Sequence, residues 1–148
     1  MELILQYKNF FEICRHDVNS LFYYWSSENF QQHKISGGNY TSVWCQEALD
    51  FAYRVIKINF MVLDYPDVDP AGQEMDDILK KMSDNSPNNA DGGAIWSTYQ
   101  FYLMEKGRNF IDAWLASGDD RLFGQKLIDI FNAHNVGFDK HAFYPVKY

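Results

Sequence analysis

Residues 41–63, TSVWCQEALDFAYRVIKINFMVL, carry apolar side chains at every third or fourth position. The β-branched residues Val55 and Ile56 favour strands by propensity, but the spacing follows the 3.6-residue period of a helix and not the two-residue period of a strand. Thr41 or Ser42 can accept hydrogen bonds from the first backbone amides of such a helix. The stretch therefore predicts a long helix with one buried face, and it favours a helical fold.

The segment that precedes it shows the same spacing. Its apolar positions describe one face of a helix that ends near Ser26 and Ser27, and they are Leu3, Tyr7, Phe10, Phe11, Cys14, Val18, Leu21, Phe22 and Trp25. Residues 28–40, ENFQQHKISGGNY, lose the pattern and contain two consecutive glycines. We therefore expect a loop between the first two helices.

The second half of the chain alternates helical patterns with turn signals. A short helix is expected from about Pro70 to Met82, and another from Ala94 to a glycine stop at Gly107. Two more helices follow. Asn109 is a possible cap and Gly118 the stop of the first, and Asp119 and Asp120 lie in the first turn of the second, where the helix dipole favours anions. Residues 83–93, SDNSPNNADGG, offer nothing to bury and predict a mobile surface loop.

The tail is irregular but aromatic, and we expect it to dock on the body through Phe138, Phe143 and Tyr144. The chain shows no internal repeat and no alternating strand pattern longer than a few residues. The predicted fold is all-α: an irregular bundle of five or six helices in a single domain, residues 1–148.

The composition limits the classes of function. With 13 basic and 20 acidic residues the net charge is −7, which argues against direct binding to nucleic acid or to an anionic membrane surface. No stretch resembles a secretory signal or a membrane span, and Cys14 and Cys45 lie on apolar helical positions without a CxxC spacing. Buried thiols in a reducing cytoplasm are therefore expected. The 12 Phe, 10 Tyr and 4 Trp exceed the usual aromatic share and can serve a core or an interface.

Residues 63–79, LDYPDVDPAGQEMDDIL, contain six acidic side chains and no base. An EF-hand calcium loop would place Asp67, Asp69 and Gly72 at its first, third and sixth positions. Ala71 and Ile78 then occupy the fifth and twelfth positions, where an EF-hand needs oxygen ligands. The segment therefore does not match an EF-hand calcium loop. Asp69 and Pro70 instead make a credible start of a helix, because proline lacks an amide hydrogen and a donor at the first helical position would have no partner within the helix.

A helix start needs one carboxylate, and this segment holds six. Such crowding repels itself in the free protein, and a cationic partner would relieve the repulsion, although a charge run is also typical of a solvated surface. The predicted partner-binding residues are Asp64, Tyr65, Asp67, Asp69, Glu74, Asp76 and Asp77.

Signals for catalysis or metal binding are weak. His16–Asp17 is similar to the metal-binding dyad of HD-type phosphohydrolases, but that pattern needs an earlier histidine and none precedes His16. His134 and His141 could meet in space around Asp139, at a spacing that matches no recognised metal motif. HExxH, GxSxG and glycine-rich phosphate loops are absent from the sequence. We therefore predict no catalytic residue, no metal site and no cofactor.

In size, acidity and aromatic content, and in its DYPDVDPAGQEMDD segment, the chain resembles the small acidic immunity proteins with which bacteria neutralise toxins. The resemblance implies a non-enzymatic, cytoplasmic antitoxin that covers a basic toxin domain, such as a nuclease, with carboxylates that mimic phosphates and with Tyr65 as an aromatic anchor. The alternatives are a small helical metal-dependent enzyme and a phage or accessory protein that mimics nucleic acid. The sequence leaves the oligomeric state open.

Overall fold

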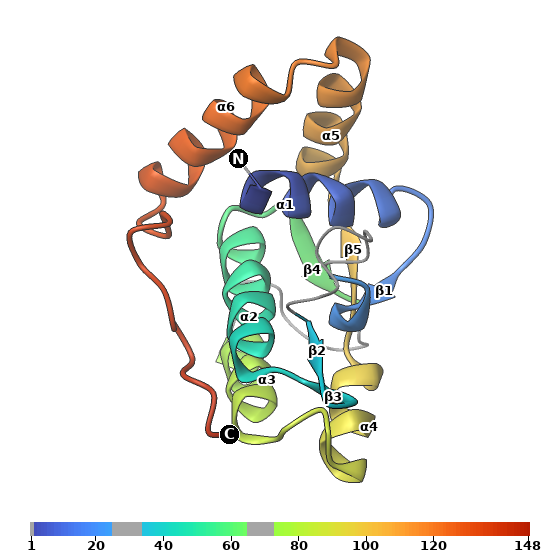
Figure 1. Ribbon diagram of the computed structural model, residues 1–148. Helices are drawn as coiled ribbons and strands as arrows, with labels where there is room; N and C mark the ends of the chain where they lie inside the picture. Colours follow the sequence, from blue (N-terminus) through green and yellow to red (C-terminus); the bar gives the residue numbers. More distant parts are fainter. Residues whose placement is uncertain (1, 25–33, 65–72) are drawn as a thin grey trace.

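The structure is a computed structural model of the 148-residue chain, and it describes residues 2–24, 34–64 and 73–148 (Figure 1). These ranges are mostly helical and contain a short 3-10 helix, η1, at Leu21–Tyr23. Their α-helices are α1 Glu2–Ile13, α2 Ser42–Lys57, α3 Gln73–Asp84, α4 Ala90–Thr98, α5 Glu105–Ser117 and α6 Asp120–Ala133.

Short antiparallel strands accompany the helices, so the prediction of a purely all-α bundle is wrong, although the helical majority is confirmed. β5 (Gln100–Leu103) forms the centre of a three-stranded sheet, with β1 (Asn19–Ser20) on one side and β4 (Met61–Leu63) on the other. β2 (Ile35–Ser36) and β3 (Asn39–Tyr40) form a hairpin inside the segment predicted as a loop. Gly37 and Gly38 turn this hairpin with φ angles of 58° and 81°, a left-handed conformation that suits glycine.

The first helix is much shorter than predicted. α1 ends at Ile13, whose carbonyl accepts a hydrogen bond from the side chain of Asn19 at 3.4 Å. The chain then reverses, and Asn19 pairs with Phe101 of β5. Leu21 is still fully buried, because β1 and η1 carry it into the core. Beyond residue 14 the apolar spacing thus reflects burial and not a continuation of the α-helix.

α2 begins as predicted, since the Thr41 side chain accepts from the Trp44 amide at 3.1 Å. It ends at Lys57, however, and not at Leu63, because the last residues of the predicted helix form β4.

Asn59 stops α2 in a left-handed conformation with φ 61°. The Asn59 amide donates to the Ile56 carbonyl and the Phe60 amide donates to the Val55 carbonyl, both at 3.0 Å. This pair of bonds is the Schellman pattern of a helix C-terminus.

The segment predicted as a mobile loop, residues 83–93, is only partly irregular. Its first two residues end α3, and residues 90–93 belong to α4. A Cβ on Gly92 would lie 1.7 Å from the Ser86 carbonyl oxygen. The glycine therefore permits a close approach between α4 and the preceding turn.

The helix predicted from Ala94 to Gly107 is wrong in its second half, because β5 interrupts it. Gly107 lies inside α5, where a Cβ would lie 2.3 Å from the Phe60 carbonyl oxygen. The N-cap of α5 is Met104 and not Asn109. Gly118 ends α5 in a left-handed conformation as predicted, with φ 66°.

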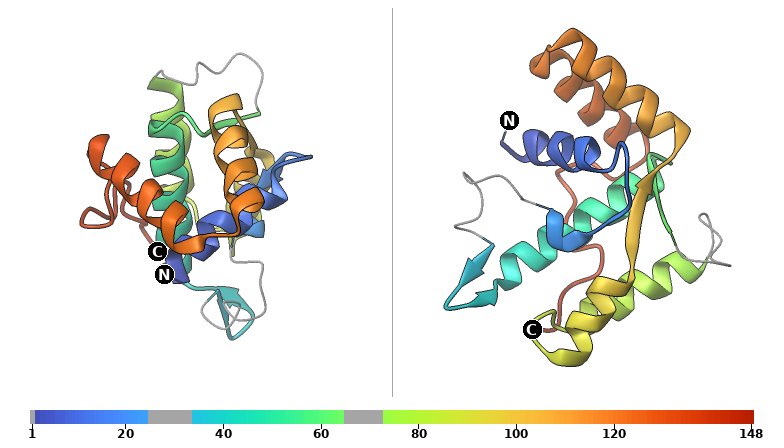
Figure 2. Two further views of the ribbon diagram at one scale, coloured as in Figure 1. Left: turned by 90° about the horizontal axis from the view of Figure 1, so that it is seen from above. Right: turned by 90° about the vertical axis from the view of Figure 1, so that its right-hand side faces the viewer.

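One cluster of buried side chains connects the helices with the sheet, and aromatic rings supply most of its largest members. Tyr7 is central: its ring contacts those of Tyr24, Phe51, Phe131 and Phe138 at centroid distances of 4.7–6.2 Å. α5 and α6 pack against α1, and the two further views show α6 lying over it (Figure 2).

The tail docks on the body, as predicted for Phe138, Phe143 and Tyr144, and runs along α2 toward α3 (Figure 1). Gln46 of α2 donates to the Tyr144 carbonyl at 3.2 Å and accepts from the Val146 amide at 3.0 Å. The Lys147 amide donates to the Ser83 carbonyl at 3.0 Å. The tail therefore connects α2 with the end of α3.

Among the residues that the structure describes, no helix combines the length and the apolar character that crossing a membrane requires.

Candidate functional site

Four of the seven predicted partner-binding residues are described. Asp64 follows β4 directly and is exposed, and its amide donates to the Gln100 carbonyl at 2.8 Å, which fixes its backbone beside the sheet. Glu74, Asp76 and Asp77 lie in α3. Tyr65, Asp67 and Asp69 lie outside the described residues, as do Gly72 and the proposed helix start at Asp69 and Pro70.

The orientation of α3 decides which of its carboxylates face solvent. Its apolar residues Met75, Ile78, Leu79 and Met82 are buried in the core. Glu74 and Asp77 are therefore held exposed on a helix whose inner face is packed. Ile78, which stands at the twelfth position of the EF-hand alignment, is one of these buried residues.

Asp76 serves an internal contact. It is half-buried, its carboxylate accepts from the Tyr144 hydroxyl at 2.8 Å, and it lies 3.6 Å from the Lys57 ammonium. Burial, and then the hydrogen bond to the Asp76 carboxylate, raise the pKa of Tyr144 far above its usual value, so the phenol stays protonated and can donate. Asp76 thereby ties the tail to α3.

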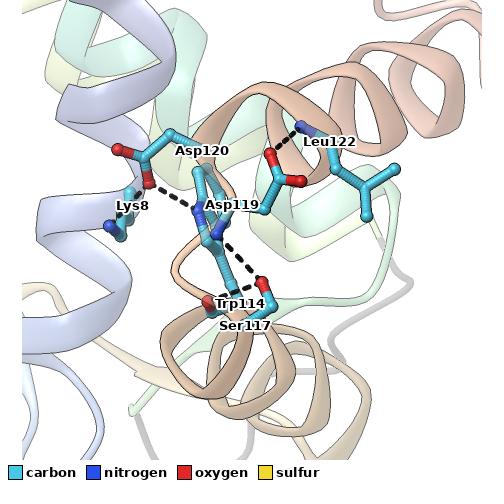
Figure 3. Close-up of polar contacts among 6 residues, drawn as sticks. All are labelled: Lys8, Trp114, Ser117, Asp119, Asp120 and Leu122. Carbon is cyan, nitrogen blue, oxygen red and sulfur yellow. Dashed lines mark hydrogen bonds and ion pairs between the residues drawn. The ribbon is translucent and has the colours of Figure 1, made fainter.

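Two further aspartates show how a carboxylate is used for structure (Figure 3). At the start of α6, Asp119 caps the helix by accepting from the Leu122 amide at 2.9 Å. Asp120 accepts from the Lys8 ammonium at 2.7 Å and from the Trp114 indole at 2.9 Å, which joins α1, α5 and α6. These hydrogen bonds lower the pKa of Asp120 and hold it ionised.

A shallow depression of about 380 Å³ brings Asp64 together with His16–Asp17, the dyad noted in the sequence. Its other lining residues are Cys14, Arg15, Val18, Tyr102 and Arg108. Arg15 is paired with Asp112 of α5 at 3.0 Å, and the Arg108 guanidinium donates to the Arg15 carbonyl.

Tyr102 is 38% exposed, which makes it one of the few large aromatic side chains that face solvent in the described chain. The depression is thus lined by carboxylates, arginines and an aromatic ring. The sequence singled out Asp64 and the dyad separately, but it carried no signal for Tyr102 or Arg108, because β5 and the start of α5 were predicted as one helix.

The histidines do not gather into a metal centre within the described ranges. No group of three or more His, Cys, Asp or Glu side chains there is arranged to hold a metal ion. His134 is exposed, and its Nδ1 lies 2.9 Å from the Ile130 carbonyl oxygen of its own helix, whereas His141 lines a different cavity beside α2.

Both cysteines are buried free thiols, as predicted. Burial raises the pKa of Cys14 and of Cys45 to about 12, so both thiols stay protonated near neutral pH. Because the thiolate is the nucleophilic form, neither is poised to react.

Comparisons of the chain with family models, with curated proteins and with solved structures find no match.

Proposed function

We propose that the chain is a non-enzymatic protein-binding module that engages a basic partner through an acidic face, defined as Asp64, Glu74 and Asp77. The observation that carries the proposal is the geometry of α3. Its inner face is buried, and Glu74 and Asp77 are held exposed on its outer side. A binding surface works best when its charged groups stand on a fixed scaffold, because fewer degrees of freedom are lost on association.

The mechanism is electrostatic attraction followed by steric cover. A net charge of −7 attracts a cationic protein over distances comparable to the Debye length, about 8 Å at physiological ionic strength. On contact, the acidic face pairs with lysines and arginines, and the depression beside Asp64 presents Tyr102 as an aromatic contact. The same segment contains Tyr65, Asp67 and Asp69, and we predict that these residues contact the partner as well.

We further propose that the module is a cytoplasmic immunity protein whose partner is a toxin domain, such as a basic nuclease. The support is the resemblance in size and acidity, with a sequence pI near 4.9, and the exposed carboxylates that can take the place of nucleic-acid phosphates. The protonated, unreactive thiols of Cys14 and Cys45 suit a protein that uses neither disulfides nor cysteine chemistry.

The test uses a triple charge reversal, D64K/E74K/D77K. The tagged wild type is first used to capture its partner from the native host, and association with the purified partner is then followed at several salt concentrations. We expect the variant to associate at least about tenfold more slowly at low salt and to lose most of the salt dependence, because steering depends on these charges.

The matched control is E12K/E105K/D129K, which makes the same change in net charge at exposed positions on α1, α5 and α6. If the control slows association as much as D64K/E74K/D77K does, the association rate depends only on the net charge, and the proposal that the acidic face binds the partner is wrong. A captured partner that is itself acidic would contradict the proposal at its first step.

A further inference from the structure

The tail that follows α6 is hydrogen-bonded to α3, the helix that carries two residues of the acidic face. The Tyr144 hydroxyl donates to the Asp76 carboxylate at 2.8 Å, in the first turn of the helix. The Tyr148 hydroxyl donates to the Met82 carbonyl at 3.0 Å, in its last turn. We call Tyr144 and Tyr148 the tail strap, because they attach the tail to both ends of α3.

The spacing of the two contacts fits a tail that runs along the helix. The contacted residues of α3 are six positions apart, which at a rise of 1.5 Å per residue is about 9 Å. The two strap residues are four positions apart, and four extended residues reach at most about 14 Å. Between them, the Lys147 amide donates to the Ser83 carbonyl at 3.0 Å. The backbone of the strap is therefore fixed to the end of the helix as well.

Side chains of α2 hold the first strap residue in place. The Tyr53 ring packs edge-on against the Tyr144 ring at a centroid distance of 5.9 Å. The Lys57 ammonium lies 3.6 Å from the Asp76 carboxylate and 5.1 Å from the centre of the Tyr53 ring. These four side chains form a closed set of contacts that joins α2, the tail and α3. Such a set restrains each member more than a single contact does, because a displaced side chain disturbs two neighbours.

The first strap residue also lies beside the acidic face. Burial raises the pKa of Tyr144, and the carboxylates of Asp76 and Asp77 raise it further. A carboxylate acts on a phenol in this way only when it is near, so Asp77 lies close to the strap. Glu74 is two positions before Asp76 on the same helix. Fixing Asp76 therefore fixes the backbone from which both exposed carboxylates of α3 project.

The buried face of α3 fixes the position of the helix less strictly. Its residues Met75, Ile78, Leu79 and Met82 pack in the core. Two of these four are methionines, which adapt to irregular gaps and specify a single position poorly. Hydrogen bonds are directional and lose strength when their geometry changes. The strap therefore restrains the rotation and sliding of α3 in a way that its apolar contacts do not.

We propose that the tail strap positions the acidic face for its partner. A partner then meets carboxylates that are already fixed in place, and less conformational freedom is lost on binding. Charges that steer the encounter act over a distance, whereas the close ion pairs of the complex need exact placement. The strap therefore slows dissociation and leaves the association rate nearly unchanged. This inference rests on the proposed function, in which the acidic face binds a basic protein.

The first test uses the free chain and needs no partner. Y144F/Y148F removes both strap hydroxyls and keeps both rings, and amide hydrogen exchange is then followed by NMR. We expect the amides of α3 to exchange at least about fivefold faster than in the wild type, with a smaller change in α1 and α6, because α3 opens locally. Y23F is the matched control, since it removes a hydroxyl from a tyrosine that is 54% exposed and lies in η1.

The second test uses the partner that the tagged wild type captures from the native host. We expect Y144F/Y148F to dissociate from it about fivefold faster and to associate at a rate within about twofold of the wild type, because every carboxylate is kept. The charge reversal D64K/E74K/D77K should instead act mainly on association. Loss of position and loss of charge thus give different kinetic changes.

The proposal is overturned if the α3 amides of Y144F/Y148F keep their wild-type exchange rates, or if Y23F accelerates them equally. An equal acceleration in α1, α3 and α6 also overturns it, because the hydroxyls would then support only global stability. So does a loosened α3 with an unchanged dissociation rate. The acidic face fails by a different result, in which D64K/E74K/D77K associates as fast as the wild type. The exchange test reports on the strap in either case.

Discussion

Lys34 places an ammonium group inside the protein, with the residue only 8% exposed. Its Nζ donates to the Phe22 carbonyl and lies 5.0 Å from the centre of the Trp44 ring and 5.9 Å from that of Tyr40. Burial lowers the pKa of Lys34 to about 8, so the aromatic rings only partly replace the lost hydration. The folded state therefore favours the neutral amine more than the unfolded chain does.

We predict that K34M stabilises the protein at neutral pH and that the gain fades at high pH. Below about pH 8 both states of the wild type carry the charge, and the full desolvation cost opposes folding. Between about pH 8 and the unfolded value of about 10.4, the unfolded chain binds more protons, so wild-type stability rises by up to about 1.4 kcal/mol per pH unit. Methionine carries no charge and lacks this rise.

The measurement is the difference in free energy of unfolding between K34M and the wild type, from urea titrations at pH 7, 8, 9 and 10. Subtraction removes the opposite trend of Cys14 and Cys45, whose raised pKa values make stability fall as the pH rises above about 8.5. A difference that stays constant across this range would show that the Lys34 pKa is not lowered.

At the level of single carboxylates, the sequence predicted where acids crowd but not what each one does. Asp120 meets Lys8 across 112 positions of the chain, and Asp76 meets Tyr144 across 68. No local pattern encodes such contacts, so structural and exposed carboxylates look alike in the sequence. Asp119 was predictable as a cap, because its partner Leu122 is three residues away.

Two helices end on the same local element, an asparagine in the left-handed conformation followed by a buried apolar residue. Asn59 has φ 61° before Phe60, and Asn135 has φ 58° before Val136. As after α2, the Val136 amide returns to the Phe131 carbonyl at 2.9 Å. Asparagine is the commonest substitute for glycine at such a stop, so both ends were readable in the sequence as an Asn before an apolar residue.

We predict effects of different size for two substitutions at Asn59. N59A should lower the free energy of unfolding by about 1–2 kcal/mol, because alanine pays the full strain of the left-handed conformation. N59G should change it by less than about 0.5 kcal/mol, because glycine adopts this conformation freely but gains flexibility when unfolded. Urea unfolding measures both, and the exposed position makes packing changes small. Equal losses in the two variants would mean that the asparagine side chain, and not its backbone conformation, stabilises this stop.

The tail is a second element that side chains of α2 hold in place. The Asp50 carboxylate accepts from the Ala142 amide at 2.9 Å and from the Phe143 amide at 3.1 Å, and the residue is 4% exposed. The tail has no regular secondary structure, so these side-chain bonds satisfy backbone groups that a sheet or helix would otherwise pair.

We predict that D50N lowers the free energy of unfolding by about 2–3 kcal/mol, because the amide offers one acceptor where two backbone donors need partners. It should also speed limited proteolysis within residues 138–148, since the tail is released before the core. D129N is the matched control: Asp129 is exposed, and its loss should change stability by less than about 0.5 kcal/mol. Unchanged proteolysis of D50N would show that Asp50 does not hold the tail.

The strands of the three-stranded sheet were the elements that local patterns could not predict. β4 pairs Leu63 with Phe101, and β1 pairs Asn19 with the same residue, so partners lie at least 38 positions apart. Strands of two to four residues are too short to show alternation, and β4 is buried on both faces, which leaves a continuous apolar run. In the sequence this apolar run looked like the end of a helix. Its residues are apolar because the strand is buried, and not because they follow a helical period.

For the whole molecule, the mostly helical fold followed from composition and periodicity. The surface charge affects the stability of that fold. A net charge of −7 opposes the compact state through self-repulsion. The proposal that the acidic face serves a partner implies that this repulsion is concentrated there: Asp64 and Asp77 belong to a segment of six acids, whereas Glu12 and Glu105 stand among mixed charges.

We therefore predict that D64N/D77N stabilises the free protein by about 0.5 kcal/mol at an ionic strength of about 0.01 M, where the Debye length is about 30 Å, and by nothing measurable at about 1 M, where it is about 3 Å. The control E12Q/E105Q removes the same two charges from exposed positions and should gain less, because the charge lost there is less crowded. Urea unfolding at the two sodium chloride concentrations measures the four values. Equal gains in stability in both variants would show that repulsion is spread evenly over the surface. The acidic face would then hold no extra repulsion that a partner could relieve.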